Sequence, residues 1–168
     1  ARQLRVRVRG IPVRCGPVFF LGGGLLGWGS GRTGVLIGVC MVVGGGSVLL
    51  HELGHATAQR SFGAHPTITL TGFGGYTSGP AQPRAKSLVV TLAGPGAGLL
   101  AGIVGALLSQ VVSTDSELFR TAQHDLLWLN PFGGVFNLVP VRPLDGGPRA
   151  AQPSGWRPGG FRRPGGAV

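Results

Sequence analysis

Charged residues are scarce in this chain, and acidic residues are the scarcest of them. Only 12% of the 168 residues are charged, and five are aspartate or glutamate. Soluble domains carry about a quarter charged residues, whereas this chain is 43% hydrophobic and contains 33 glycines. Membrane helices tolerate glycine because small residues let helices pack closely. The composition argues against an ordinary soluble domain and favours a membrane protein.

Cysteine is also rare, since Cys15 and Cys40 are the two cysteines of the chain. Their separation does not match the spacing of a cysteine-based metal site. Both lie within or beside apolar stretches. The sequence therefore predicts neither a disulfide framework nor a metal centre built from cysteine.

The chain contains four apolar stretches without charged residues, at residues 16–31, 33–50, 87–113 and 126–141. A membrane-spanning helix needs about 20 such residues. The second and third stretches meet this length, whereas the first and fourth are marginal. We expect an all-α polytopic membrane protein with about four transmembrane segments.

The basic residues are distributed unevenly around these stretches. If all four stretches cross the membrane, thirteen of the fifteen lysines and arginines lie on one side, and Arg32 and Arg120 lie on the other. The positive-inside rule then places both termini in the cytoplasm, in a multi-pass protein of the cell membrane. This topology accounts for the net charge of +10. Nucleic-acid binding is not predicted, because the arginines are spread between apolar stretches and no nucleic-acid-binding motif occurs.

The second apolar stretch leads into the motif His51-Glu52-Leu53-Gly54-His55. Histidines at positions i and i+4 lie on one face of a helix, where two imidazoles can bind one Zn²⁺ ion. The glutamate beside the first histidine can act as a general base. The alternative is a helix with two unconnected histidines and a structural ion pair between Glu52 and Arg60.

A catalytic zinc site needs three protein ligands and one open position. His51 lies about 27 Å along the helix from the start of the second stretch, near its cytoplasmic end. The fourth stretch runs in the same direction and ends just before Asp145, which is therefore the best-placed third ligand. The alternative for Asp145 is a turn residue, because Asp-Gly-Gly is a strong turn signal.

The loop at residues 67–77 follows this motif and has the pattern of a small β-hairpin. Residues 67–71 alternate polar and apolar side chains, and Gly74 and Gly75 can turn the chain back. A hairpin here would present an edge strand that can capture an unwound substrate segment through main-chain hydrogen bonds. The alternative is a plain cytoplasmic loop.

Four ordered segments of the chain resemble the site-2 proteases, a family of intramembrane zinc metalloproteases. They are the motif at residues 51–55, the glycine-rich segment at 71–77, the Ala-Gly-Pro segment at 93–98, and the Asn-to-Leu-Asp-Gly segment at 137–147. The resemblance covers roughly residues 10–147.

This resemblance implies specific roles for the residues of the motifs. His51, His55 and Asp145 would bind Zn²⁺, and Glu52 would activate the water that attacks a peptide carbonyl. Asn137 would hold the substrate backbone or the developing oxyanion. The substrate would be a single-pass membrane protein already trimmed by another protease, and its cytoplasmic fragment would be released.

The sequence suggests a membrane-embedded protease domain at residues 1–147 and a low-complexity, disordered cytoplasmic tail at 148–168. We expect a membrane-protein substrate and the lipid bilayer as partners, and the oligomeric state is left open. Pro148 and the tail favour one alternative, a truncated inactive relative that binds membrane helices without cutting them. A metal transporter is a more distant alternative, because the third stretch lacks polar residues along most of its length.

Overall fold

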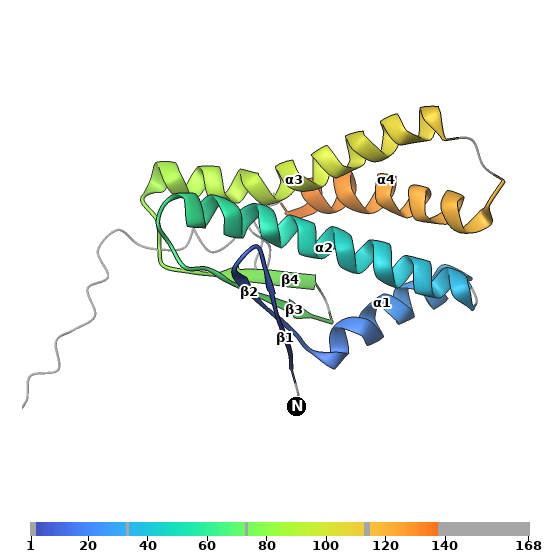
Figure 1. The fold of residues 1–168 in the computed structure, drawn as a ribbon, viewed down its shortest axis with the longest axis horizontal. Helices are drawn as coiled ribbons and strands as arrows, with labels where there is room; N and C mark the ends of the chain where they lie inside the picture. The colour runs from blue at the N-terminus through green and yellow to red at the C-terminus, as the bar shows by residue number, and fades with distance from the viewer. Residues whose placement is uncertain (1–2, 33, 73, 113–114, 138–168) are drawn as a thin grey trace, which may run out of the picture.

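The computed structural model describes the backbone of residues 3–32, 34–72, 74–112 and 115–137, with side chains up to residue 130. The elements in chain order are β1 (Leu4–Val8), β2 (Ile11–Cys15), α1 (Pro17–Gly29), α2 (Val35–Ser61), β3 (Thr67–Thr71), β4 (Gly74–Ser78), α3 (Arg84–Val111) and α4 (Glu117–Asn137). Helix α2 lies in the middle, between α3 and α4 on one side and the sheet with α1 on the other (Figure 1).

Of the four helices in the described ranges, α2 and α3 are long and apolar enough to cross a membrane. Their 27 and 28 residues correspond to about 41 Å of helix each, more than the roughly 30 Å hydrocarbon core of a bilayer. Helix α1 begins at Pro17 and has 13 residues, about 20 Å. Helix α4 starts at Glu117, nine residues before the apolar stretch that predicted it.

The surface of α3 has the pattern of a helix in lipid. Its buried residues include Gly94, Gly98, Gly102 and Gly105. Its exposed large side chains include Leu88, Leu92, Leu99, Leu100, Ile103, Val104, Leu107 and Leu108. A helix that turns glycines inward and leucines outward packs closely against its neighbours and leaves its apolar surface to the surrounding lipid. This pattern supports the membrane assignment.

The sequence predicted an all-α protein, and this prediction is wrong. The chain also forms a four-stranded sheet in the order β1-β2-β3-β4. Strand β1 pairs antiparallel with β2 through a two-residue turn, in which Arg9 and Gly10 both have positive φ. That geometry is the type I′ turn, which matches the twist of a hairpin. Residues 4–8 carry a strand signal, an alternation of apolar residues with arginine, and the same arginines also form the basic flank of the first apolar stretch.

The predicted hairpin at residues 67–77 is present as β3 and β4, which pair antiparallel from Thr67 with Ser78 to Thr71 with Gly74. The sequence predicted that Gly74 and Gly75 form its turn, but the two glycines are the first residues of β4. The turn comes before Gly74 in the chain, because Thr71 and Gly74 are paired with each other across the two strands. The need for a glycine at position 75 is explained instead by the close packing of β4 against α2.

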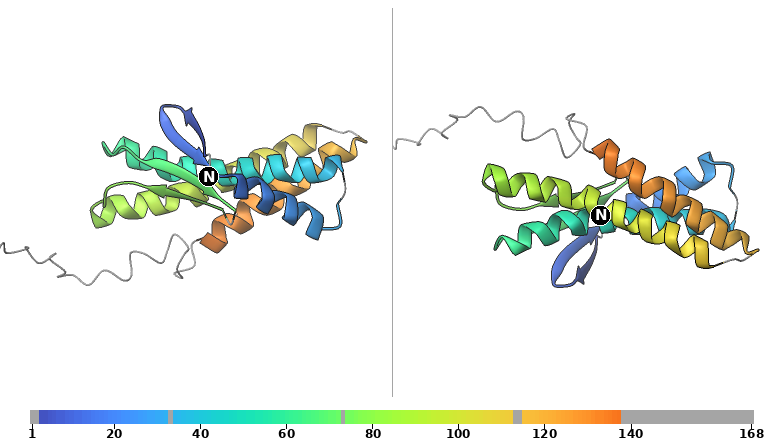
Figure 2. Two further views of the ribbon diagram at one scale, coloured as in Figure 1. Left: turned by 90° about the horizontal axis from the view of Figure 1, so that it is seen from below. Right: turned by 90° about the horizontal axis from the view of Figure 1, so that it is seen from above.

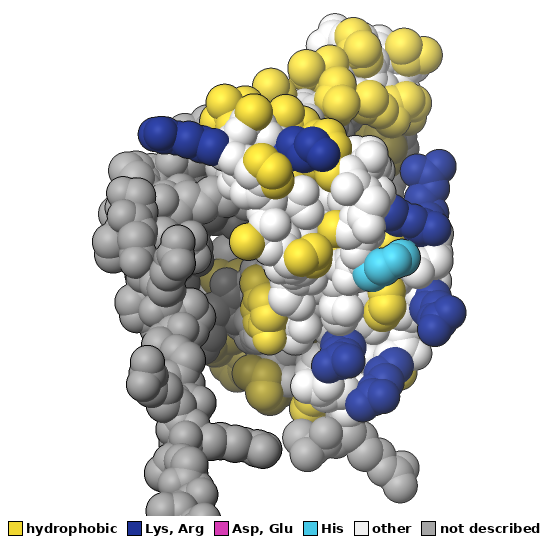
Figure 3. All heavy atoms as spheres, turned by 90° about the vertical axis from the view of Figure 1, so that its left-hand side faces the viewer, with side chains coloured by type: hydrophobic (Ala, Val, Ile, Leu, Met, Phe, Trp, Pro, Cys, Tyr) yellow, Lys and Arg dark blue, Asp and Glu magenta, His cyan; other side chains and the backbone are white. Residues whose placement is uncertain are grey.

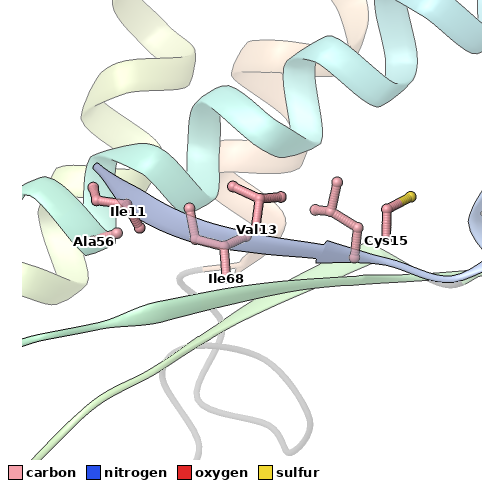
Figure 4. Packing of buried hydrophobic residues seen from close by; sticks show 6 residues of the cluster. Ile11, Val13, Cys15, Ala56 and Ile68 are labelled. Atoms are coloured by element: carbon pink, nitrogen blue, oxygen red, sulfur yellow. The ribbon is translucent and has the colours of Figure 1, made fainter. Parts of the chain in front are cut away.

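The core of the sheet lies between its upper face and α2. Ile11, Val13 and Cys15 of β2 and Ile68 and Leu70 of β3 pack with Ala56 of α2. Figure 4 shows these side chains between the strand and the helix. Because β2 pairs in parallel with β3, the N-terminal hairpin and the later hairpin form one continuous sheet. This packing holds β4 against the histidine motif.

Candidate functional site

His51 and His55 form a buried pair on α2. Their relative exposures are 7% and 5%. The rings meet edge to face with centroids 4.8 Å apart, and the two Nε2 atoms are 3.1 Å apart. The spacing of four residues in one helix brings the two rings together, as the sequence predicts.

The backbone of α3 orients the His55 ring. Its Nδ1 lies 2.6 Å from the carbonyl oxygen of Val90. A carbonyl can only accept a hydrogen bond, so Nδ1 carries the proton and the neutral ring has its lone pair on Nε2. Histidines that bind metals are commonly oriented by such a second hydrogen bond.

Gly94, one turn further along α3, lies directly against the same ring. A Cβ atom at this position would overlap the imidazole of His55. The glycine therefore makes room for the ring between the two helices.

The arrangement of the two rings fits one zinc ion. Two Zn–N bonds of about 2.0–2.1 Å at a tetrahedral angle place the nitrogens about 3.3 Å apart, close to the observed 3.1 Å between the Nε2 atoms. Within the described part of the chain, no group of three or more His, Cys, Asp or Glu side chains could hold a metal. The predicted third ligand, Asp145, lies outside the described residues.

Glu52 is buried between α2 and the sheet, with a relative exposure of 4%. The hydroxyl of Thr77 on β4 donates a hydrogen bond of 2.7 Å to Glu52 Oε2. A Cβ atom at Gly75 would lie 2.7 Å from Glu52 Cγ. Gly75 is thus the position where β4 passes over the glutamate, and its lack of a side chain permits this close approach.

Thr77 is the site residue that the sequence analysis missed. Thr77 and Gly75 are two residues apart on one strand and therefore point to the same face. Once β4 was predicted, this alternation was the signal that both face the same neighbour. The sequence alone could not show that the neighbour is Glu52.

The structure also locates the other candidates. Arg60, the alternative partner of Glu52, donates a hydrogen bond to the carbonyl oxygen of Arg9. Gly74 begins β4 with a φ of 132°. Asn137 is the last residue of α4, and its side chain lies outside the described part. His124 lies on α4, with its Nδ1 atom 3.4 Å from Oδ1 of Asp125.

A cavity of about 790 Å³ extends from His51 and Glu52 between α1, α2 and α4. Its lining is mostly apolar and includes Phe19 and Met41. Glycines of α1 and α2 line other parts of the wall. An elongated apolar cavity next to buried polar groups can accept a peptide segment away from bulk water.

An ion pair lies in the wall of this cavity, at the end away from the histidines. The guanidinium of Arg32, between α1 and α2, donates hydrogen bonds of 2.6 and 2.7 Å to the two carboxylate oxygens of Asp125 on α4. These bonds to Asp125 raise the pKa of Arg32. Bidentate pairs of this kind combine strength with a defined geometry, so the pair joins the α1–α2 connection to α4.

Comparison with known proteins gives consistent similarities. No protein-family model matches the chain. Zinc metalloprotease MJ0392 of Methanocaldococcus jannaschii is 34% identical over 102 residues, which cover 60% of this chain and 30% of MJ0392. Rip3 of Mycobacterium tuberculosis, which carries the words zinc metalloprotease in its name, is 37% identical over 117 residues, covering 66% of this chain and 29% of Rip3. The chain spans about 30% of the length of these relatives.

A solved structure has the same fold. The site-2 protease from Methanocaldococcus jannaschii superimposes with a TM-score of 0.68 and 29% sequence identity. The match covers 87% of this chain and 68% of that structure.

Proposed function

The chain belongs to the site-2 protease family, and on this premise we propose that it is a zinc metalloendopeptidase that cleaves a transmembrane segment of a membrane-protein substrate near the cytoplasmic face. One observation carries the proposal: the Nε2 atoms of His51 and His55 are 3.1 Å apart, next to a buried glutamate. This arrangement is suited to peptide hydrolysis at a metal.

In the proposed site, His51, His55 and Asp145 would hold the zinc ion. Zinc bound there would supply Lewis-acid chemistry, which polarises a carbonyl oxygen and makes water more acidic. Glu52 takes a proton from the attacking water and passes it to the leaving amine. Thr77 keeps the glutamate in place through its hydrogen bond to Oε2.

The substrate segment would unwind and lie along β4. This strand is at the end of the sheet order β1-β2-β3-β4, so within the described ranges no further strand covers its outer edge. Gly74 and Gly75 would let the substrate backbone approach closely, and Asn137 would hold it or the developing oxyanion. The apolar cavity beside His51 would keep the cleaved bond away from bulk water.

For the membrane arrangement, we propose that all four helices take part in the embedded domain at residues 1–147, with both termini in the cytoplasm and residues 148–168 as a tail. The exposed apolar surface of α3 and the length of α2 support the embedding. The asymmetry of the basic residues supports the orientation.

The first experiment measures the zinc content of the detergent-purified protein and cleavage of a reconstituted single-pass substrate. We expect about one zinc per chain in the wild type, the stoichiometry of a single catalytic site. His51→Ala and Asp145→Ala should lose zinc and activity, whereas Glu52→Gln should keep zinc and lose activity.

Two other outcomes would contradict the proposal, one for the third zinc ligand and one for the protease activity. Zinc that survives Asp145→Ala would mean that another residue is the third ligand. A wild type that binds zinc but cleaves nothing, or binds no zinc after reconstitution, would favour the inactive relative that only binds membrane helices.

A further inference from the structure

The N-terminal hairpin and the adjoining end of α2 carry a cluster of arginines that the proposed chemistry does not use. In the register of the sheet, Arg5 is the direct partner of Arg14. The core residues of β2 face α2, so these arginines, in alternate positions, face the opposite side. The exposed arginines of this hairpin and of the adjoining end of α2 are together called the arginine cluster. They are Arg5, Arg7, Arg9, Arg14 and Arg60.

The arrangement is costly unless an anion balances it. Like charges that are direct neighbours across two strands destabilise a sheet. Of the carboxylates in the described ranges, Glu52 is buried in the site, and the other three lie at or near α4, on Asp115, Glu117 and Asp125. Figure 3 shows lysine and arginine side chains around this end of the molecule and no acidic side chain among its coloured residues.

The cluster lies at the depth of lipid headgroups if α2 crosses the bilayer as proposed above. A span of about 20 residues from Val35 ends near Gly54, so Arg60 is about 9 Å beyond the hydrocarbon. Arg60 donates its hydrogen bond to the carbonyl of Arg9, in the hairpin turn. This contact places the turn of the β1–β2 hairpin at the same level.

The hairpin also has the shape and the apolar side of a membrane-surface element. Both views in Figure 2 show it projecting sideways beyond the helices. On β1, Leu4 and Val6 alternate with the arginines and are 60% and 49% exposed. Segments that combine exposed aliphatic and basic side chains are typical of membrane interfaces.

We propose that the arginine cluster binds the headgroups of anionic phospholipids in the leaflet that contains the site. Basic residues near an anionic surface each add to the binding, and the effect weakens with salt. An acidic segment of the substrate fits less well, because β4 lies at the opposite edge of the sheet from β1. The bound lipid would hold the sheet that carries Thr77 over Glu52.

The test uses hydrogen–deuterium exchange of residues 4–15 in the full chain reconstituted into lipid nanodiscs. One set of discs is purely phosphatidylcholine, and the other contains about one third phosphatidylglycerol, a sufficient surface charge for basic clusters. We expect exchange to be slower by about tenfold in the anionic discs at low salt, with the difference reduced at high salt. This readout does not depend on protease activity, so it can fail while the proposed function holds.

Two matched double variants separate the cluster from general basic charge. Arg5→Gln with Arg7→Gln should abolish the lipid dependence, whereas Arg84→Gln with Lys86→Gln, which removes the same charge from the start of α3, should retain it. Arg5→Lys with Arg7→Lys should also retain most of it. This rescue distinguishes a charge effect from a folding defect.

Several results would overturn the proposal. Equal exchange in the two kinds of disc, or a lipid dependence that persists in Arg5→Gln with Arg7→Gln, would show that the cluster does not bind lipid. Protection by inorganic phosphate in phosphatidylcholine discs would indicate a site for a free anion. Protection by a polyglutamate peptide in the same discs would assign the surface to an acidic protein partner.

Discussion

At the scale of single residues, the orientation of the site depends on contacts made by neighbouring elements rather than by α2 itself. Val90 of α3 accepts the hydrogen bond from His55 Nδ1. Thr77 of β4 donates to Glu52 Oε2. His55 and Glu52 are thus held by different elements of the fold, so a change at Thr77 should affect Glu52 and spare the histidine.

The first prediction concerns Thr77. In Thr77→Val, the carboxylate of Glu52 loses a charge-assisted hydrogen bond of 2.7 Å while the side-chain volume is kept. Such bonds contribute about 1.5–3 kcal/mol, so we expect kcat to fall by at least about tenfold. Zinc content should be unchanged, because the hydroxyl donates its hydrogen bond to Glu52, which is not one of the proposed zinc ligands.

The control is Thr77→Ser, which keeps the hydroxyl and should retain most of the activity. Both variants are compared with the wild type by kcat and by metal analysis. Loss of zinc in Thr77→Val, or full activity in it, would contradict the positioning role.

At the scale of elements, α3 packs so closely on α2 that glycines line the contact. Gly54 of α2 lies against the backbone of Ala93, and Gly94 of α3 lies against His55. Gly96 lies two residues further on. A Cβ atom added there would have no atom within 4 Å apart from the nearby backbone of its own helix and its two chain neighbours. The helix therefore has one face where a methyl group disrupts the site and another where it has room.

This difference yields a matched pair of variants in one helix. Gly94→Ala should push the imidazole of His55 from its place, because a Cβ atom at position 94 would lie 2.3 Å from Nε2 of the ring. Disturbing the orientation of a ligand commonly costs 10–100-fold in metal affinity, and we expect a loss of about that size. Gly96→Ala should bind zinc like the wild type.

Zinc affinity of the two variants is measured by competition with a chelator. Thermal unfolding in detergent is recorded in parallel, to show that both variants fold. Equal affinity in Gly94→Ala and Gly96→Ala would mean that the ring is not confined as the structure indicates.

At the scale of the whole molecule, a hydrophobic core and an ion pair join elements at the two ends of the cavity. The core between the sheet and α2 organises the end that carries the site. At the other end of the cavity, the pair between Arg32 and Asp125 joins the α1–α2 connection to α4. The side chains of Arg32 and Asp125 are 19% and 6% exposed.

The third prediction concerns this pair. Arg32→Gln leaves the buried carboxylate of Asp125 without its guanidinium, and breaking a buried ion pair from one side costs about 3 kcal/mol. We expect a corresponding loss in the free energy of unfolding in detergent. Arg120→Gln, which removes an exposed arginine from α4, should change stability by no more than about 0.5 kcal/mol.

The two variants are compared by denaturant unfolding under one set of detergent conditions. Similar stability of Arg32→Gln and the wild type would show that the pair does not join the elements as proposed. The charge-conserving Arg32→Lys should fall between them, because lysine lacks the bidentate geometry.

The parts of the fold that depend on local patterns were predictable. The pairing of His51 with His55 follows from the helical repeat. The hairpin at residues 67–77 follows from its alternation of side chains, and α2 and α3 follow from the length of their apolar stretches. The N-terminal hairpin was missed, although residues 4–8 alternate in the same way, because its arginines were explained by membrane topology alone.

The sequence by itself determined the residue types of the site, their spacing along α2 and the helices that can lie in a membrane, because these properties are local and repeat every few residues. Only the tertiary structure decided that Thr77 and Gly75 meet Glu52, that Val90 and Gly94 confine His55, and that Arg32 reaches Asp125. These contacts join residues 23 to 93 positions apart. The packing of the sheet and of α3 and α4 around α2 brings such distant residues together, and no local pattern encodes that packing.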